Sequence, residues 1–328
     1  MEKILSYAKR VLDGEEISFD EAVELIHTSD EDTMVLLAMA DKIRQKFNGN
    51  EVDLCAIVNA RSGKCPENCK FCAQSAHYDT GVKEYPLLAE DALLEAAKKA
   101  KEAGAIRFSV VTSGRNTSNP KEFEQIIHVL RRIREEVGVE ICCSLGLLEL
   151  EQAKQLKEVG VTRYHSNIET APSNFPNICS THSYEDKMYT INNAKEAGLR
   201  ICSGGIFNLG ESLEQRVEMA FTLKELGVDS IPLNLLNPIP NTPFEKNSPL
   251  SPLEILRTFA VFRFILPHAQ IRTAGGREIN LRSLQALALT GGLNGIMVGN
   301  YLTTEGRAPE EDLQMISDLH LSRTPISL

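Results

Sequence analysis

The fold can be predicted from the stretch Lys101-Glu102-Ala103-Gly104 and the run Ile106–Thr112 that follows it. A charged pair and Ala103 are typical of the last turn of a helix. Gly104 suits the left-handed conformation that ends many helices. The run after it is rich in apolar and β-branched residues, as in a buried parallel strand. The stretch therefore predicts a helix, a glycine stop and a strand, in that order.

The same helix ending recurs four more times along the chain, at Glu135–Gly138, Lys157–Gly160, Lys195–Gly198 and Lys224–Gly227. With the strands before and after these units, eight strands are expected: Leu54–Ala60, Ile106–Thr112, Val139–Leu145, Thr162–Ile168, Leu199–Ile206, Ser230–Leu236, Gln270–Ala274 and Gly295–Gly299. Strands that alternate with helices form a parallel sheet. Eight such units in ~250 residues favour a closed α/β barrel of the TIM type, (β/α)8, and an open doubly wound sheet is the alternative.

The chain divides into three expected parts. Residues 1–50 read as a helical N-terminal extension, with a capping box of Ser18 and Glu21 and a helical run at Leu36–Phe47. Residues 51–320 form the barrel, including a last helix near Leu313–Leu319, and residues 321–328 form a C-terminal tail. No linker rich in Pro or Ser interrupts the chain.

Composition excludes several classes of function. The chain has 328 residues and a formal net charge of −10, which disfavours a protein built to hold nucleic-acid phosphates. No run approaches the ~20 apolar residues of a membrane helix, and no signal-peptide pattern opens the chain. We therefore expect a cytoplasmic protein, free of membranes, whose eight cysteines are buried, catalytic or metal-binding rather than paired in disulfides.

Three of these cysteines lie close together after the first predicted strand, in Cys65-Pro66-Glu67-Asn68-Cys69-Lys70-Phe71-Cys72. Three thiolates suit an iron–sulfur cluster whose fourth iron stays open to a ligand that is not protein. A tetrahedral zinc site would need a fourth ligand, for which His77 is the nearby candidate. In a parallel barrel the chemistry lies at the carboxyl ends of the strands, which is where this loop falls.

This cysteine motif resembles that of the radical S-adenosylmethionine (SAM) superfamily. The flanking sequence is more specific and closely resembles the biotin synthase family. The segments that carry the resemblance span most of the expected barrel: Asn59–Tyr78, Cys202–Ile206, Gly275–Ser283 and Asn300–Thr304.

The resemblance implies the cofactors, the reaction and many of the site residues. A [4Fe–4S] cluster on Cys65, Cys69 and Cys72 would bind SAM and cleave it to a radical that takes hydrogen from dethiobiotin, before sulfur is inserted. The residues expected to contact the cofactor are Phe71, Asn167, Glu169, Lys187, Ile206 and Asn234. Those expected to contact the substrate are His165, Asn167, Asn234, Thr303 and Thr304.

The same resemblance implies a second, auxiliary iron–sulfur cluster that donates the sulfur. Its matching residues here are Cys142, Cys202 and Arg272, which makes the two cysteines catalytic as well as metal-binding. The family has a further cysteine on the second strand, where this chain carries Ser109, a poor ligand for a soft metal. The type of this cluster is therefore left open.

Three more cysteines need separate expectations. Cys179, in the loop after the fourth strand, is a candidate replacement ligand of the auxiliary cluster. Cys143 neighbours Cys142, and strand alternation points the two to opposite faces unless the strand bulges. Cys55, at the start of the first expected strand, should lie at the far end of the barrel with a structural role.

Two rival functions remain. One is another radical SAM enzyme on the same scaffold, of the hydrogenase-maturation or methylornithine-synthase type. The other is a non-catalytic iron–sulfur carrier, which would not need polar residues lining a barrel. The resemblance also implies an electron donor such as a reductase, flavodoxin or ferredoxin, and leaves a homodimer open.

Overall fold

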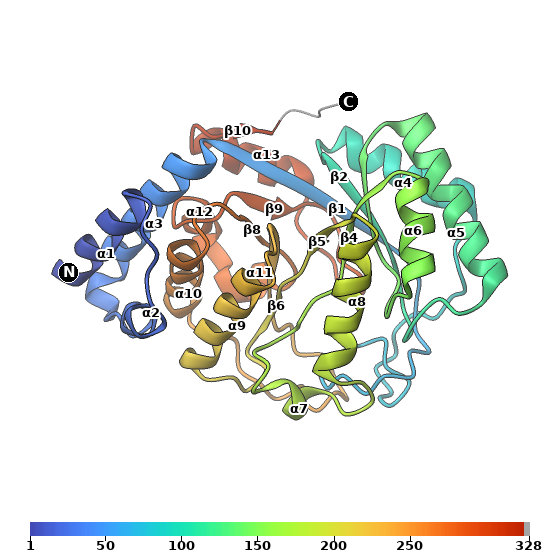
Figure 1. The fold of residues 1–328 in the computed structure, drawn as a ribbon, viewed down its shortest axis with the longest axis horizontal. Coiled ribbons are helices and arrows are strands. Elements are labelled where there is room, and N and C mark those ends of the chain that lie inside the picture. Colours follow the sequence, from blue (N-terminus) through green and yellow to red (C-terminus); the bar gives the residue numbers. More distant parts are fainter. Residues whose placement is uncertain (325–328) are drawn as a thin grey trace.

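The structure, a computed structural model, describes residues 1–324. Its parallel strands follow the order β1-β2-β3-β4-β5-β7-β8-β9, and β9 pairs back with β1. This closed ring confirms the predicted barrel and excludes the open sheet. The helices surround the strands on the outside (Figure 1).

The barrel strands lie close to their predicted positions, at β1 Glu51–Arg61, β2 Arg107–Thr112, β3 Glu140–Ser144, β4 Val161–His165, β5 Arg200–Cys202, β6 Gly205–Phe207, β7 Ser230–Leu235, β8 Gln270–Thr273 and β9 Gly295–Met297. The fifth strand, expected as one run, is two short strands separated by Ser203 and Gly204. A Cβ on Gly204 would lie 1.9 Å from the carbonyl oxygen of Pro232, so only glycine fits at this position. The break thus follows from the close approach of β7.

Helices follow the strands as expected. They are α1 Glu2–Leu12, α2 Phe19–Ile26, α3 Asp30–Asn48, α4 Glu90–Glu102, α5 Pro120–Arg132, η1 Ile133–Val137, α6 Leu150–Glu158, α7 Phe175–Ile178, α8 Tyr184–Glu196, α9 Leu213–Glu225, α10 Pro252–Ile265, α11 Arg277–Leu281, η2 Arg282–Leu284, α12 Gln285–Leu289 and α13 Pro309–Asp318. The five glycines of the repeated helix ending all have positive φ, between 56° and 93°. They act as the left-handed stops that the sequence predicts.

The N-terminal helices pack on one side of the barrel, beside α9 and α10 (Figure 1). The predicted capping box starts α2: Ser18 Oγ accepts from the Glu21 N–H, and the Glu21 carboxylate accepts from the Ser18 N–H. At the other end of the chain, the short strand β10, Ser322–Arg323, pairs with the beginning of β1. Residues 325–328 of the expected tail lie outside the described residues.

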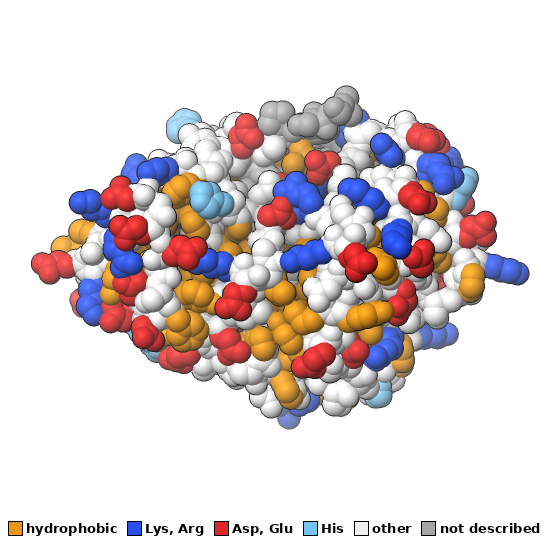
Figure 2. Space-filling view, in the orientation of Figure 1, with side chains coloured by type: hydrophobic (Ala, Val, Ile, Leu, Met, Phe, Trp, Pro, Cys, Tyr) orange, Lys and Arg blue, Asp and Glu red, His pale blue; other side chains and the backbone are white. Residues whose placement is uncertain are grey.

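Acidic and basic side chains are interspersed over the face drawn in Figure 2, without a continuous basic stripe on that face. Exposed ion pairs between elements also occur, such as that of Lys3 on α1 with Glu24 on α2, whose Nζ and Oε2 lie 2.8 Å apart. Within residues 1–324, no helix combines the length and hydrophobicity needed to cross a membrane.

Candidate active site

The barrel encloses a cavity of about 340 Å³. Inward-facing side chains of the strands and of the loops at their carboxyl ends line it. The predicted site residues that it brings together are Phe71, Cys72, Cys142, His165, Asn167, Glu169, Cys202, Ile206, Asn234, Arg272, Thr303 and Thr304. They come from all parts of the chain between residues 71 and 304, so only the closed barrel can assemble them.

The loop after β1 places the three motif cysteines at the edge of this cavity. The loop is folded on itself: the Cys65 N–H donates to the Gln74 carbonyl at 3.0 Å, and the Cys72 N–H donates to the Cys69 carbonyl at 3.0 Å. Cys72 lines the main cavity, and Cys65 and Cys69 line an adjoining one of about 150 Å³. All three are free, half-buried thiols. Burial raises the pKa of Cys72 to about 11.

Glu169 and Asn167 stand between these two cavities and line both. Glu169 has a φ of 68°, in the left-handed region that side chains other than glycine rarely adopt. A hydrogen bond holds the backbone there, because the Glu169 N–H donates to the Gly204 carbonyl at 3.1 Å. Lys187, from α8, brings its Nζ to 4.0 Å from Glu169 Oε1. A carboxylate and an ammonium thus lie side by side next to the cysteine loop.

The amide of Asn234 has a fixed orientation. Its Nδ2 donates to the Gly205 carbonyl at 3.2 Å, and its Oδ1 accepts from the Gly275 N–H at 3.0 Å. Thr303 and Thr304 line the same cavity from the loop after β9, where the Thr304 carbonyl accepts from the Tyr301 N–H at 3.0 Å. These groups give the cavity a polar wall with hydrogen-bonding positions set by the backbone.

Buried thiols and an arginine occupy the barrel strands further along the cavity. Cys142 is on β3, Cys202 on β5 and Arg272 on β8, all at most 5% exposed. An Arg272 amino group donates to Ser230 Oγ at 2.9 Å. Burial raises the pKa of Cys142 to about 12. Burial also opposes ionisation of Cys202, but His165 and Arg272 outweigh it and lower the pKa of that thiol.

Two observations test whether this end of the cavity fits a soft-metal group. The Nε of Arg272 and the Oγ of Ser109 are buried without a hydrogen-bond partner among the described residues. Unpartnered buried polar atoms are costly unless something else satisfies them. Free thiols facing the same space are the preferred ligands of iron–sulfur clusters. The residues present therefore fit such a group.

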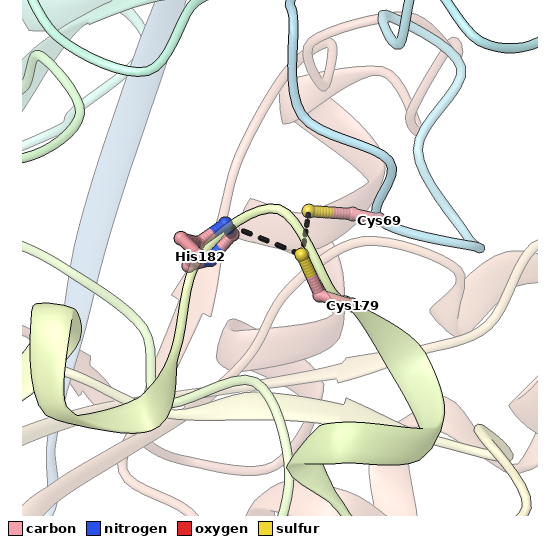
Figure 3. A group of neighbouring side chains, drawn as sticks. All are labelled: Cys69, Cys179 and His182. Carbon is pink, nitrogen blue, oxygen red and sulfur yellow. Dashed lines mark hydrogen bonds between the residues drawn. The ribbon is translucent and has the colours of Figure 1, made fainter.

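Cys179 lies elsewhere than expected. Its sulfur is 3.8 Å from that of Cys69 and 3.2 Å from His182 Nδ1, outside the residues that line the main cavity (Figure 3). Asn68 positions it, because its Oδ1 accepts from the Ser180 N–H at 2.9 Å and draws the α7 loop onto the cysteine loop. Cys179 is thus removed from the residues expected at the auxiliary cluster.

Cys55 also differs from expectation. β1 begins at Glu51 rather than Leu54, so Cys55 lies well inside the strand, and it lines the main cavity beside Ile57. It therefore lines the cavity rather than lying apart from it at the far end of the barrel. Cys143, in contrast, is fully buried in the hydrophobic core behind the barrel wall, which confirms that it and Cys142 face opposite sides.

Sequence reasoning missed a polar cluster that supports the cysteine loop. The Glu67 carboxylate lies 2.6 Å from His182 Nδ1 and 3.0 Å from Arg115 Nη1. No local pattern signals it, since the three residues are far apart along the chain. His77, weighed as a zinc ligand, has its Nε2 2.9 Å from the Pro66 carbonyl instead.

Comparison with known proteins identifies the family. A family model described as the radical SAM superfamily matches residues 60–235, and one described as the biotin and thiamin synthesis associated domain matches residues 232–322. Biotin synthase of Carboxydothermus hydrogenoformans is 51% identical over 320 residues, 97% of this chain and 98% of that protein. Biotin synthase of Geobacter sulfurreducens is 51% identical over 317 residues, 97% of this chain and 96% of that protein.

Solved structures agree on the fold. Methylornithine synthase aligns with a TM-score of 0.86 at 18% identity, covering 98% of each chain. A maturase of the [FeFe]-hydrogenase aligns with a TM-score of 0.85 at 18% identity, covering 100% of this chain and 76% of that one. At 18% identity the likeness to these structures shows only the barrel fold. The biotin synthases that are 51% identical over nearly the full chain show the family. The chain belongs to the biotin synthase family of radical SAM enzymes.

Proposed function

We propose that this protein converts dethiobiotin to biotin by inserting sulfur inside the central cavity. One observation carries the proposal: a single cavity has Cys72 at one part of its wall and Cys142, Cys202 and Arg272 at another. A substrate in that cavity would face both a hydrogen-abstracting and a sulfur-donating group. Neither rival function needs the second set of thiols.

Cys65, Cys69 and Cys72 would hold the [4Fe–4S] cluster. When bound, this cluster and SAM supply a 5′-deoxyadenosyl radical for hydrogen abstraction, and the auxiliary cluster supplies sulfur. The carboxylate of Glu169 would accept hydrogen bonds from the ribose hydroxyls of SAM, and Lys187 beside it would attract the carboxylate of the methionyl part. Lys187 offers a point charge without the fork geometry of an arginine.

The other cofactor and substrate contacts follow from the fixed groups of the cavity wall. Phe71 and Ile206 pack in one apolar cluster and would cover the cofactor. The amides of Asn167 and Asn234 offer both donors and acceptors, which suits the ureido ring of dethiobiotin. Thr303 and Thr304 would bind its carboxylate.

His165 and the apolar wall would control what else enters the cavity. His165 is on β4 next to Cys202 on β5 and would make a polar contact with the substrate there. Ile57, Val111 and Met297 line the same space with apolar side chains. A primary alkyl radical needs a closed cavity, because it must meet the substrate while water and stray C–H groups are kept away from it.

The proposal includes the surroundings of the reaction. The enzyme would act on a small molecule in the cytoplasm, without nucleic acid or membrane, and would take electrons from a reductase or from a flavodoxin- or ferredoxin-type protein. A homodimer is the proposed assembly, which sedimentation of the anaerobically purified protein would test.

One anaerobic reaction tests the function. The reconstituted protein is mixed with SAM, dethiobiotin and a strong reductant, and the products are measured by mass spectrometry. Biotin together with 5′-deoxyadenosine is expected, and neither should form with Cys72→Ala. 5′-Deoxyadenosine without biotin would favour another radical SAM reaction, and no SAM cleavage would favour a carrier.

A further inference from the structure

Ser109 leaves the auxiliary site one thiolate short of the pattern that the family resemblance implies. The serine is buried, lines the cavity and has an Oγ without a hydrogen-bond partner in the described residues. A neutral hydroxyl binds soft metals poorly compared with a thiolate. Cys142 and Cys202 therefore need a further soft ligand from another strand.

Cys55 is the thiol that the cavity offers. It is 5% exposed and lines the cavity together with Cys142, Cys202 and Arg272. On β1 it lies two residues from Asp53 and from Ile57 and so shares their face of the strand. The Oδ1 atom of Asp53 is 3.3 Å from Nη2 of Arg272. Cys55 therefore faces the interior of the barrel, on the strand that precedes the one carrying Ser109.

The strand register shows at which height Cys55 lies. In a barrel of eight strands with a shear of eight residues, residues at one height shift by about one position per strand, so by about two over two strands. Starting from each of the four residues, we follow the pairing to the neighbouring strand and then to the strand after it. The paired residues are Cys55–Arg107–Glu140, Cys142–Arg163–Arg200, Cys202–Ser230–Gln270 and Arg272–Gly295–Asp53.

Each series ends two residues before the next of the four residues, which is the shift expected for residues at the same height. The last series ends at Asp53, two residues before Cys55, and so closes the ring. Cys55, Cys142, Cys202 and Arg272 thus form one layer of four side chains from alternate strands, the arrangement typical of such barrels. Ser109 pairs with Cys142 across β2 and β3, which puts it in the neighbouring layer. Cys55 therefore occupies the fourth position of the layer that Cys142, Cys202 and Arg272 form, whereas Ser109 lies outside that layer.

The spacing of the thiols suits a cluster rather than a single ion. A tetrahedral ion with metal–sulfur bonds of about 2.3 Å holds its sulfurs roughly 3.8 Å apart. Among the described residues, Cys69, Cys179 and His182 are the group whose ligand atoms lie within 4.8 Å of one another, and the layer of Cys55 does not meet that limit. Thiols at wider spacing around a shared cavity fit a group that contains several irons.

The charge around the layer favours an anionic group. Three guanidinium groups, those of Arg107, Arg163 and Arg272, line the cavity with the thiols. Asp53 forms ion pairs with Arg107 and with Arg272, and Asp229 forms one with Arg163, so that these carboxylates offset part but not all of the charge. Thiolates and inorganic sulfides carry negative charge, which such a wall stabilises.

We propose that Cys55 is a thiolate ligand of the auxiliary iron–sulfur cluster, in one layer with Cys142, Cys202 and Arg272, and that it takes over the part of the missing second-strand cysteine. The inference rests on the proposed function, since it assumes a sulfur-donating cluster in this cavity. Under this proposal β1 contributes to both clusters: Cys55 within the strand would bind the auxiliary cluster, and the loop after the strand would bind the [4Fe–4S] cluster.

The test isolates the auxiliary cluster. In a background with Cys65, Cys69 and Cys72 all replaced by alanine, iron that remains after anaerobic reconstitution reports the auxiliary site. Cys55→Ala is compared with Cys143→Ala, the same change at a buried thiol that faces the hydrophobic core. Iron and sulfide per chain, the visible absorption spectrum and the rate of iron release to a chelator are measured, with circular dichroism to confirm folding.

Cys55→Ala should lose iron and sulfide in parallel and release the rest at least about tenfold faster, because even residues that only orient a metal ligand change affinity by about 10- to 100-fold. Cys143→Ala should match the background. Equal iron and equal release in the two variants would overturn the proposal, as would a loss caused by Ser109→Ala instead.

The outcome is separable from the proposed function. If the background chain binds iron through Cys55 but the intact protein forms no biotin, the function fails and the ligand assignment stands. If biotin forms and Cys55→Ala keeps its iron, the assignment fails alone.

Discussion

Arg277 and Asp312 form a buried ion pair that fastens the C-terminal helix to the barrel. Both side chains are fully buried, and two hydrogen bonds join them, one at 3.0 Å and one at 2.5 Å. Arg277 also donates to Tyr301 Oη at 3.2 Å, in the loop that carries Thr303 and Thr304. Arg277→Met should therefore destabilise the fold and disturb this side of the cavity.

The magnitude follows from burial. Two unit charges about 3 Å apart attract by roughly 5 kcal/mol at an effective permittivity of about 20. Removing one partner leaves Asp312 buried, with Arg307 at 3.5 Å as its remaining cation. A loss of about 3–5 kcal/mol in the free energy of unfolding is expected. Replacing both residues, Arg277→Met with Asp312→Leu, should recover much of it, because no charge stays buried.

Anaerobic urea unfolding followed by circular dichroism measures this cycle. The control is Glu151→Gln, which breaks the exposed pair of Lys154 and Glu151, whose side chains are 48% and 77% exposed. That change should cost less than about 1 kcal/mol. If Arg277→Met cost no more than the control, or if the double variant were as unstable as the single one, burial of the charged pair would not determine its effect on stability.

Three further predictions follow from the site and its supports. Gly205→Ala should cost about 1–3 kcal/mol and weaken SAM binding, because its Cβ would lie 2.3 Å from the Glu169 carbonyl oxygen; unchanged binding by calorimetry would contradict this. Lys187→Ala should weaken SAM binding by about 10- to 100-fold, with Lys187→Arg restoring most of it in the same titration. Burial raises the pKa of Asp229, but Arg163 and Arg200 outweigh it and hold that pKa below its usual value. Its stabilisation is therefore present above about pH 4 and lost as the pH falls through the lowered value, and Asp229→Asn should flatten that acid-induced loss in unfolding experiments.

Most of the fold could be predicted from the sequence, because each strand–helix unit of the barrel carries its own local signals. The helix endings with glycine and the β-branched runs place most strands within a few residues of their observed bounds. The break in the fifth strand was not readable, since it depends on Gly204 meeting Pro232 from another strand. Sequence periodicity reports which face a residue takes, but not which distant backbone presses against it.

The site shows the same division. Cys142 and Cys143 could be separated by strand alternation alone, and the structure places them on opposite faces. Cys55 was misplaced because the first strand starts three residues earlier than its apolar run suggests, at the charged residue Glu51. Cys179 was misplaced because Asn68, more than a hundred residues away, sets the path of its loop.

The origin of the sulfur atom in biotin shows whether a cluster bound in the central cavity is the sulfur donor. The protein is reconstituted anaerobically with sulfide enriched in a heavy sulfur isotope, freed of unbound sulfide, and given SAM, dethiobiotin and a reductant for a single turnover with sulfide of natural isotopic composition in solution. If one cavity holds both reacting groups, the biotin carries heavy sulfur from the protein-bound cluster. Biotin that carries only the natural isotope from solution would show that the protein-bound cluster is not the sulfur donor.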